Sequence, residues 1–188
     1  MPGPQLDDEG STPRPVTERE RADAFLGLVL ASNDLVRILD RNLKDEHGIS
    51  LHEFEVLLFL VAFSEDGAMQ MTELRRRTPL SQSRVSRVVS ALESRRLVRR
   101  TTDPTDNRAV TVTITAKGRR TFTPAQSRHQ QDLDEHLFSV LTDREIRQLG
   151  SITAKILAAG PRRRASSHRQ GRRGESREGA GRHRRGID

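Results

Sequence analysis

Hydrophobic positions along the first third of the chain repeat every three or four residues, as in amphipathic helices. Thr17 and Glu20 form a capping box ahead of the first repeat, in which each side chain bonds to the backbone amide of the other residue. Gly48 is placed to end this helix, because glycine readily adopts the left-handed conformation of a helix C-terminus. Ser50 and Glu53 form a second box before the run VLLFLVAF. The pattern predicts two helices, the second central in the core.

The middle of the chain changes from short helices to strands. A short helix is predicted just before Pro79, and a second from Ser81, which can cap it, to about Arg95. Two strands follow at 97–101 and 109–115, the latter with strictly alternating apolar residues. Two short helices joined by a tight turn and followed by a hairpin are typical of a winged helix-turn-helix domain.

Two further helices complete the predicted domain. Thr115 can cap a long helix that reaches about Val140, and Thr142 and Glu145 form a third capping box. We interpret the apolar stripe of this last helix as buried; it consists of Ile146, Leu149, Ile152 and Ile156. The fold class is therefore mainly α, a winged helix-turn-helix domain with a two-stranded β wing, flanked by N- and C-terminal helices.

Composition divides the chain into three parts. Residues 1–16 and 161–188 have few apolar side chains and are predicted to be disordered, so residues 17–160 form the domain. The last 28 residues hold ten arginines and three acidic residues, which accounts for the formal net charge of +7. Within the neutral remainder, residues 73–120 hold 13 basic and 4 acidic residues. A basic segment between acidic flanks is expected of a DNA-reading module, here at about 50–120, although a solvated basic surface has the same charge.

Several classes of protein are disfavoured by composition and motif. The chain has no cysteine, tryptophan or tyrosine, which excludes disulfides and thiolate metal sites and disfavours recognition by base stacking. It has no G-x-S-x-G, Walker-type or HExxH motif, so we expect neither an enzyme nor a cofactor. The N-terminus does not resemble a secretory signal, and the longest apolar run, Val56 to Phe63, is too short to cross a bilayer. A cytoplasmic protein without membrane contact is expected.

The segment that begins at Ser81 has one apolar and one polar face. Its apolar stripe comprises Val85, Val88, Val89 and Leu92, at the i, i+3, i+4, i+7 spacing of a core-facing helix. At 100° per residue, Ser83, Arg87 and Ser90 point almost the opposite way. Small hydroxyl side chains let a helix approach the base edges, and arginine can donate two hydrogen bonds to guanine. The residues predicted to contact DNA here are Ser81, Gln82, Ser83, Arg84, Ser86, Arg87 and Ser90. An ordinary amphipathic helix with a solvated polar face would show the same pattern.

The predicted hairpin adds a second candidate contact. Its tip, DPTDN followed by Arg108, is exposed by its turn chemistry. Arg108 can enter a minor groove, where negative potential attracts guanidinium groups. The alternative is a surface arginine paired with Asp106. A helix-turn-helix followed by a basic hairpin is more specific than either feature alone.

The segments MTELRRRTPLSQSRVSRVVSALESRRLVRR and DPTDNRAVTVTITAKG together resemble the MarR (multiple antibiotic resistance regulator) family, over about Thr17 to Ala158. The resemblance implies an obligate homodimer whose first and last helices interlock. It implies that Ser83, Arg84, Ser86 and Arg87 read the major groove, that Arg108 enters the minor groove and that Asp106 supports the wing. It also implies a repressor on a pseudo-palindromic operator in double-stranded DNA, released by a small-molecule effector whose identity and binding residues are unknown.

Two features depart from the family pattern. Arg96 follows the recognition helix where the family usually has glycine, so either a positive φ there is strained or the turn differs. The arginine-rich tail lies outside the resemblance. A non-specific, chromatin-like DNA-binding protein driven by that tail is therefore an alternative, as is an all-helical protein-interaction module. The tail would add phosphate affinity in the first case and is otherwise a solvated segment.

Three residues of the long helix are weak candidates for a metal or pH sensor. His129, Asp132 and His136 are spaced i, i+3, i+7 and fall within about one helical face. The favoured interpretation is that the two histidines lie at the dimer interface and are satisfied by hydrogen bonds. No metal is therefore expected, and a His-based sensing regulator stays an alternative.

Overall fold

The computed structural model describes residues 14–102 and 109–160. They divide into two compact units between Leu137 and Phe138. The predictions for residues 1–13, for the wing tip with Asp106 and Arg108, and for the tail at 161–188 fall outside the described residues.

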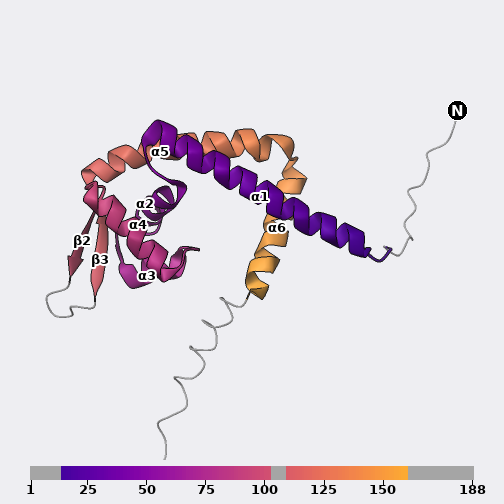
Figure 1. Ribbon diagram of the computed structural model, residues 1–188, viewed down its shortest axis with the longest axis horizontal. Coiled ribbons are helices and arrows are strands. Elements are labelled where there is room, and N and C mark those ends of the chain that lie inside the picture. The colour runs from indigo at the N-terminus through magenta and orange to yellow at the C-terminus, as the bar shows by residue number, and fades with distance from the viewer. Residues whose placement is uncertain (1–13, 103–108, 161–188) are drawn as a thin grey trace, which may run out of the picture. The chain divides into compact units, whose positions relative to one another are not determined.

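The first unit contains the elements of the predicted winged helix-turn-helix (Figure 1). They are, in order, α1 (Glu18–His47), α2 (Leu51–Ala62), β1 (Ala68–Gln70), α3 (Met71–Arg77), α4 (Gln82–Ser94), β2 (Val98–Thr102), β3 (Val110–Ile114) and α5 (Ala116–His136). The second unit contains the 3-10 helix η1 (Phe138–Val140) and α6 (Asp143–Ala159). The long helix thus ends at His136, earlier than the predicted Val140, and η1 follows it.

The helix boundaries follow the capping residues. All three predicted capping boxes are present, at the N-caps Thr17, Ser50 and Thr142. Gly48 ends α1 with φ +65°, and its amide donates to carbonyls of the last turn. These boundaries are set locally, since each depends on a side chain within three residues of the helix end.

The small sheet has three antiparallel strands in the order β1-β3-β2. The central strand places Val112 opposite Met69 on one side and Arg100 on the other. The predicted two-stranded wing is formed by β2 and β3. The third strand, β1, was not predicted, because three residues are too few for an alternating pattern and their partner strand lies more than 40 residues further on.

The core lies around α2, as its apolar sequence predicts. Phe54, Val56, Leu57 and Leu60 are almost completely buried, together with Leu39 and Leu43 at the end of α1. The C-terminal part of α1 packs on α2 and α5, and α4 packs on α2. These contacts fix the position of α4 in the first unit.

Other apolar side chains are exposed in this single chain. The N-terminal half of α1 exposes Phe25, Leu26, Leu28 and Leu30 by about half or more, and α6 exposes Ile152, Ile156 and Leu157 similarly. No residue of α6 is buried. The prediction of a buried stripe on the last helix is therefore wrong for the described residues: Ile152 and Ile156 are exposed, and Ile146 and Leu149 are only half-buried.

Candidate DNA-binding surface

The apolar stripe of α4 faces the core as predicted. Val85, Val89 and Leu92 are completely buried, and Val88 is half-buried against the same core. A helix anchored along this line must present its remaining faces outward. The rotation of α4 on the domain is thereby fixed.

The polar residues of α4 occupy the outer surface. Those that are exposed are Ser81, Gln82, Ser83, Arg84, Arg87 and Ser90. Ser81 is the N-cap, and its hydroxyl accepts from the Arg84 amide at 3.4 Å. The mean direction of this surface is opposite the valine stripe, so the expected arrangement of small hydroxyl and guanidinium groups is present.

Ser86 differs from the other predicted contacts. It is half-buried, and its hydroxyl donates to the Gln82 carbonyl at 3.1 Å and accepts from Arg75 Nη2 at 2.9 Å. Arg75 comes from α3, so this contact ties the two helices of the helix-turn-helix together. Ser86 therefore has a structural partner in addition to any contact that it makes with DNA.

The C-terminus of α4 decides between the two possibilities for Arg96, a strained positive φ or a different turn, in favour of the positive φ. Its φ is +60°, and among the described residues it is the one non-glycine residue in that region. The Arg96 amide donates to the Glu93 carbonyl at 2.8 Å and the Leu97 amide to the Leu92 carbonyl at 2.9 Å. This is the Schellman pattern, with the buried Leu92 and Leu97 as its apolar pair. Arginine adopts a conformation here that glycine would adopt with less strain.

Further arginines surround α4 that sequence reasoning did not assign to the site. Arg75, Arg76 and Arg77 lie in the last turn of α3, and Arg99 and Arg100 lie on β2. The sequence shows only that these arginines are numerous in the basic segment. It does not show which way their side chains point. Some are already paired with carboxylates of the same unit, as the pKa directions of those carboxylates indicate.

Two carboxylates, Glu73 and Glu93, form ion pairs with some of these arginines. Hydrogen bonds from Arg76, and then from Arg77, keep the pKa of Glu73 below its usual value against the opposing effect of burial. A hydrogen bond from Arg100 likewise lowers the pKa of Glu93. Arg99 is exposed and has no ion pair within the described part of the chain. It is thus a more available cation than Arg100.

An open pocket of about 840 Å³ lies beside α4. Its lining comes from the middle of α1, the start of α2 and one side of α4, including Asp40, His52, Glu53, Arg84, Arg87 and Val88. Arg84 and Arg87 thus border the pocket as well as the outer surface. Burial alone would raise the pKa of Asp40, but hydrogen bonds from Lys44 and the Leu51 amide lower it, so this carboxylate is an anion in the pocket wall.

The histidine-containing cluster on α5 has a structural explanation. Asp132 is completely buried; its Oδ1 accepts from Asn42 Nδ2 at 2.9 Å and lies 2.9 Å from Arg128 Nη2. The His129 ring lies 4.6 Å from the Phe54 ring, while His136 is exposed. Within the described ranges, no group of three or more His, Cys, Asp or Glu side chains is arranged to hold a metal ion.

Comparison with known proteins identifies a family for part of the chain. Residues 47–109, which include α2 to β2, match the model of the MarR family. This segment therefore belongs to the MarR family. None of the helices in the described part of the chain has the length and apolar character that crossing a bilayer requires.

The proteins similar to this chain within and beyond the matched segment include further transcriptional regulators. The chain is 27% identical over 103 residues to the HTH-type transcriptional repressor MdtR of Bacillus subtilis, a match that covers 55% of this chain and 66% of that repressor. It is also similar to Sco3205, a MarR family transcriptional regulator from Streptomyces coelicolor whose structure was solved in complex with DNA. That similarity has a TM-score of 0.71 at 28% identity and covers 81% of this chain and 92% of that one. AbsC, another S. coelicolor MarR regulator, shares the fold at 23% identity, with a TM-score of 0.68 over 85% of this chain and 100% of that one.

Proposed function

We propose that this MarR-family protein is a transcriptional regulator that binds double-stranded DNA in a sequence-specific manner. The observation that carries the proposal is the rotation of α4: its valine stripe is buried, so Ser83, Arg87 and Ser90 point away from the core. Arg84 and Arg87 would contact the major groove, Arg87 at a guanine, and the small hydroxyl residues would let the helix approach the bases. Arg108, supported by Asp106, would enter the neighbouring minor groove.

We propose that the functional unit is a homodimer. The exposed apolar side chains of α1 and α6 support this, since a soluble chain rarely leaves such rows facing water. A two-fold dimer places two copies of α4 on one side of the duplex. The expected operator is a pseudo-palindrome whose half-sites lie about one helical turn, roughly 34–36 Å, apart.

We propose that the regulator is a repressor, acting in the cytoplasm, and that a small molecule in the pocket beside α4 releases it. The support is the position of Arg84 and Arg87 at both the pocket and the outer surface. A ligand that draws these guanidinium groups inward removes them from the DNA. The same ligand would also alter the separation of the two recognition helices.

Selection of binding sequences from a random duplex library tests the main proposal. The full-length protein should enrich a sequence with dyad symmetry, and Arg87→Ala should lose about 1–3 kcal/mol of discrimination at the base it contacts. Equal loss on the selected operator and on random DNA would contradict the role of Arg87. Enrichment of no sequence, with a steep salt dependence that disappears on deletion of residues 161–188, would favour the alternative of binding driven by the tail.

A further inference from the structure

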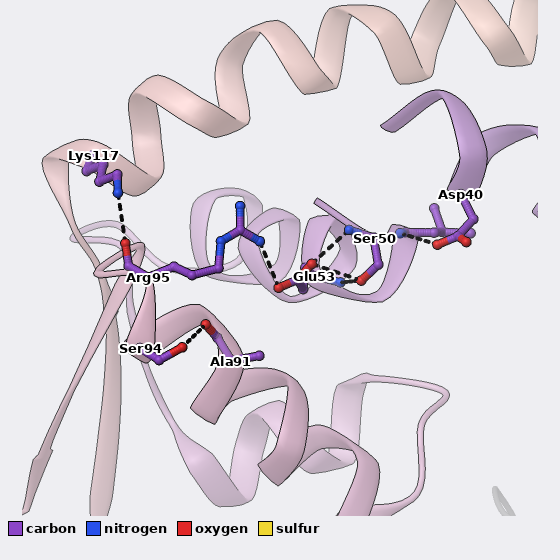
Figure 2. Close-up of polar contacts among 8 residues, drawn as sticks. Asp40, Ser50, Glu53, Ala91, Ser94, Arg95 and Lys117 are labelled. Atoms are coloured by element: carbon purple, nitrogen blue, oxygen red, sulfur yellow. Dashed lines mark hydrogen bonds and ion pairs between the residues drawn. The ribbon is translucent and has the colours of Figure 1, made fainter. Parts of the chain in front are cut away.

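One carboxylate fastens the C-terminal end of α4 to the start of α2. Glu53 Oε2 completes the α2 capping box, where it accepts from the Ser50 amide at 2.8 Å and the Ser50 hydroxyl at 3.1 Å. Its other oxygen, Oε1, accepts from Arg95 Nη1 at 3.1 Å (Figure 2). Arg95 is the C-cap residue of α4. The pair therefore joins two helix ends that are 42 residues apart in sequence.

The contact between Glu53 and Arg95 belongs to a longer series. On one side, the Leu51 amide donates to Asp40 Oδ1 of α1 at 2.9 Å. On the other, the carbonyl of Arg95 accepts from Lys117 Nζ of α5 at 3.0 Å. Figure 2 shows these groups following one another from α1, through the start of α2, to the end of α4 and the start of α5. The end of α4 is thus attached by directional bonds to the helices that carry the rest of the first unit.

Burial gives the ion pair more weight than a surface pair has. The side chain of Glu53 is 13% exposed and that of Arg95 is 40% exposed. Water screens an exposed pair so well that its contribution is small, whereas a mostly buried carboxylate that loses its partner is left uncompensated. A Cβ atom at Gly48 would lie 3.8 Å from Arg95 Nη2, so the guanidinium also lies against the corner between α1 and α2.

We infer that Arg95 is a positioning residue for DNA reading, acting through Glu53. The apolar stripe fixes which face of α4 meets the core but makes no directional bond, whereas the ion pair adds a directional contact at the C-terminal end of the helix. The ion pair at the end of α4 selects one orientation, in which Ser83 and Arg87 reach the bases together. This inference rests on the proposed role of α4, and it assigns a function to two residues that lie outside the surface predicted to touch DNA.

Two single variants test the inference in the full-length protein. Arg95→Gln removes the cation, and Glu53→Gln removes the charge that holds it while retaining a side chain that can complete the α2 capping box. Both should weaken binding to the selected operator by about tenfold, with binding to a random duplex changed much less. The matched control is Arg120→Gln, which removes one positive charge at an exposed position of α5.

The Glu53→Gln variant distinguishes an effect on the position of α4 from an effect of net charge on DNA binding. It makes the protein more positive, so long-range electrostatics alone would tighten its binding to any DNA. Weaker operator binding by this variant therefore supports the positioning role. The double variant should bind the operator no more weakly than either single variant, and Arg95→Lys should recover part of the affinity.

Several results would overturn the inference. One is operator binding by Arg95→Gln and Glu53→Gln that equals that of Arg120→Gln; another is equal loss on operator and random duplex. Thermal unfolding of each variant identifies a folding defect, in which case the milder pair Glu53→Asp and Arg95→Lys decides the question. A wild-type protein that selects no sequence would overturn the proposed function as well, so the two failures are distinguishable.

Discussion

The DNA-reading region and the helices that flank it use apolar residues in opposite ways. From α2 to the start of α5, the apolar stripes meet within the chain, and α2 and α4 together contribute eight of the twenty buried apolar residues of the core. The N-terminal half of α1 and the second half of α6 also have apolar stripes at helical spacing, and most of these side chains are exposed. A regular apolar pattern therefore indicates that a face will be covered, without indicating whether the same chain or a second copy covers it.

The largest effect is expected in the core of the reading region. Leu92→Ala removes a completely buried side chain beneath the recognition helix and should lower the free energy of unfolding by about 2–5 kcal/mol. Denaturant unfolding measures this loss, with wild type and variant compared at one protein concentration, because the unfolding of a dimer depends on concentration. The corresponding Leu157→Ala in α6, 58% exposed in the single chain, is the comparison. A smaller loss at Leu92 than at Leu157 would contradict the division into two regions.

The next prediction concerns the exposed stripe itself. Ile156→Asp places a charge on the apolar face of α6, which should raise the dimer dissociation constant by tenfold or more, since burying an unpaired charge is unfavourable. Analytical ultracentrifugation measures the change, and circular dichroism should show that helix content is retained. The control is Gln148→Asp, at an exposed polar position of the same helix. An unchanged dimer in Ile156→Asp would show that another surface joins the subunits.

The features that could be predicted from the sequence are those set by nearby residues. The three capping boxes and the rotation of α4 each depend on a few neighbouring positions, and both were confirmed. The positive φ at Arg96 is one of two possibilities that the sequence left open. Strand β1 and the pair formed by Glu53 and Arg95 could not be predicted, because each is defined by a partner more than 40 residues away.

The candidate site could be predicted only in part, because some of its contacts also join residues that are distant in sequence. Helical periodicity identifies which side chains of α4 leave the core, but not that Ser86 is bound by Arg75 of α3. The pocket combines residues of three separate helices and has no local pattern. Burial of the α6 stripe was predicted wrongly because periodicity carries no information about which molecule supplies the covering surface.

A smaller effect, with the opposite sign, is expected at Arg96. Arg96→Gly should stabilise the protein by about 0.5–1 kcal/mol, because glycine adopts a positive φ without the strain of a Cβ atom, although the unfolded chain gains some entropy. Thermal or denaturant unfolding measures the gain, and Arg96→Ala, which keeps the Cβ atom, serves as the control. Equal stability of the glycine and alanine variants would show that the backbone at this position is not strained.

The smallest effect is expected at the junction of the two regions, where α5 meets α2. Burial lowers the pKa of His129, and the charges of Asp132 and Glu55 offset this only in part. Below the ordinary histidine pKa of 6.5 the unfolded chain therefore binds a proton more readily than the folded one, so stability should decrease as the pH falls from about 6.5 toward the lower pKa of the folded protein. His129→Gln should flatten this part of the stability curve, whereas the exposed His136→Gln should not. The His129 ring packs on Phe54 in the core of the reading region, so its protonation should weaken that packing. An equal loss of stability at low pH in wild type and in His129→Gln would mean that other groups govern the response to acid.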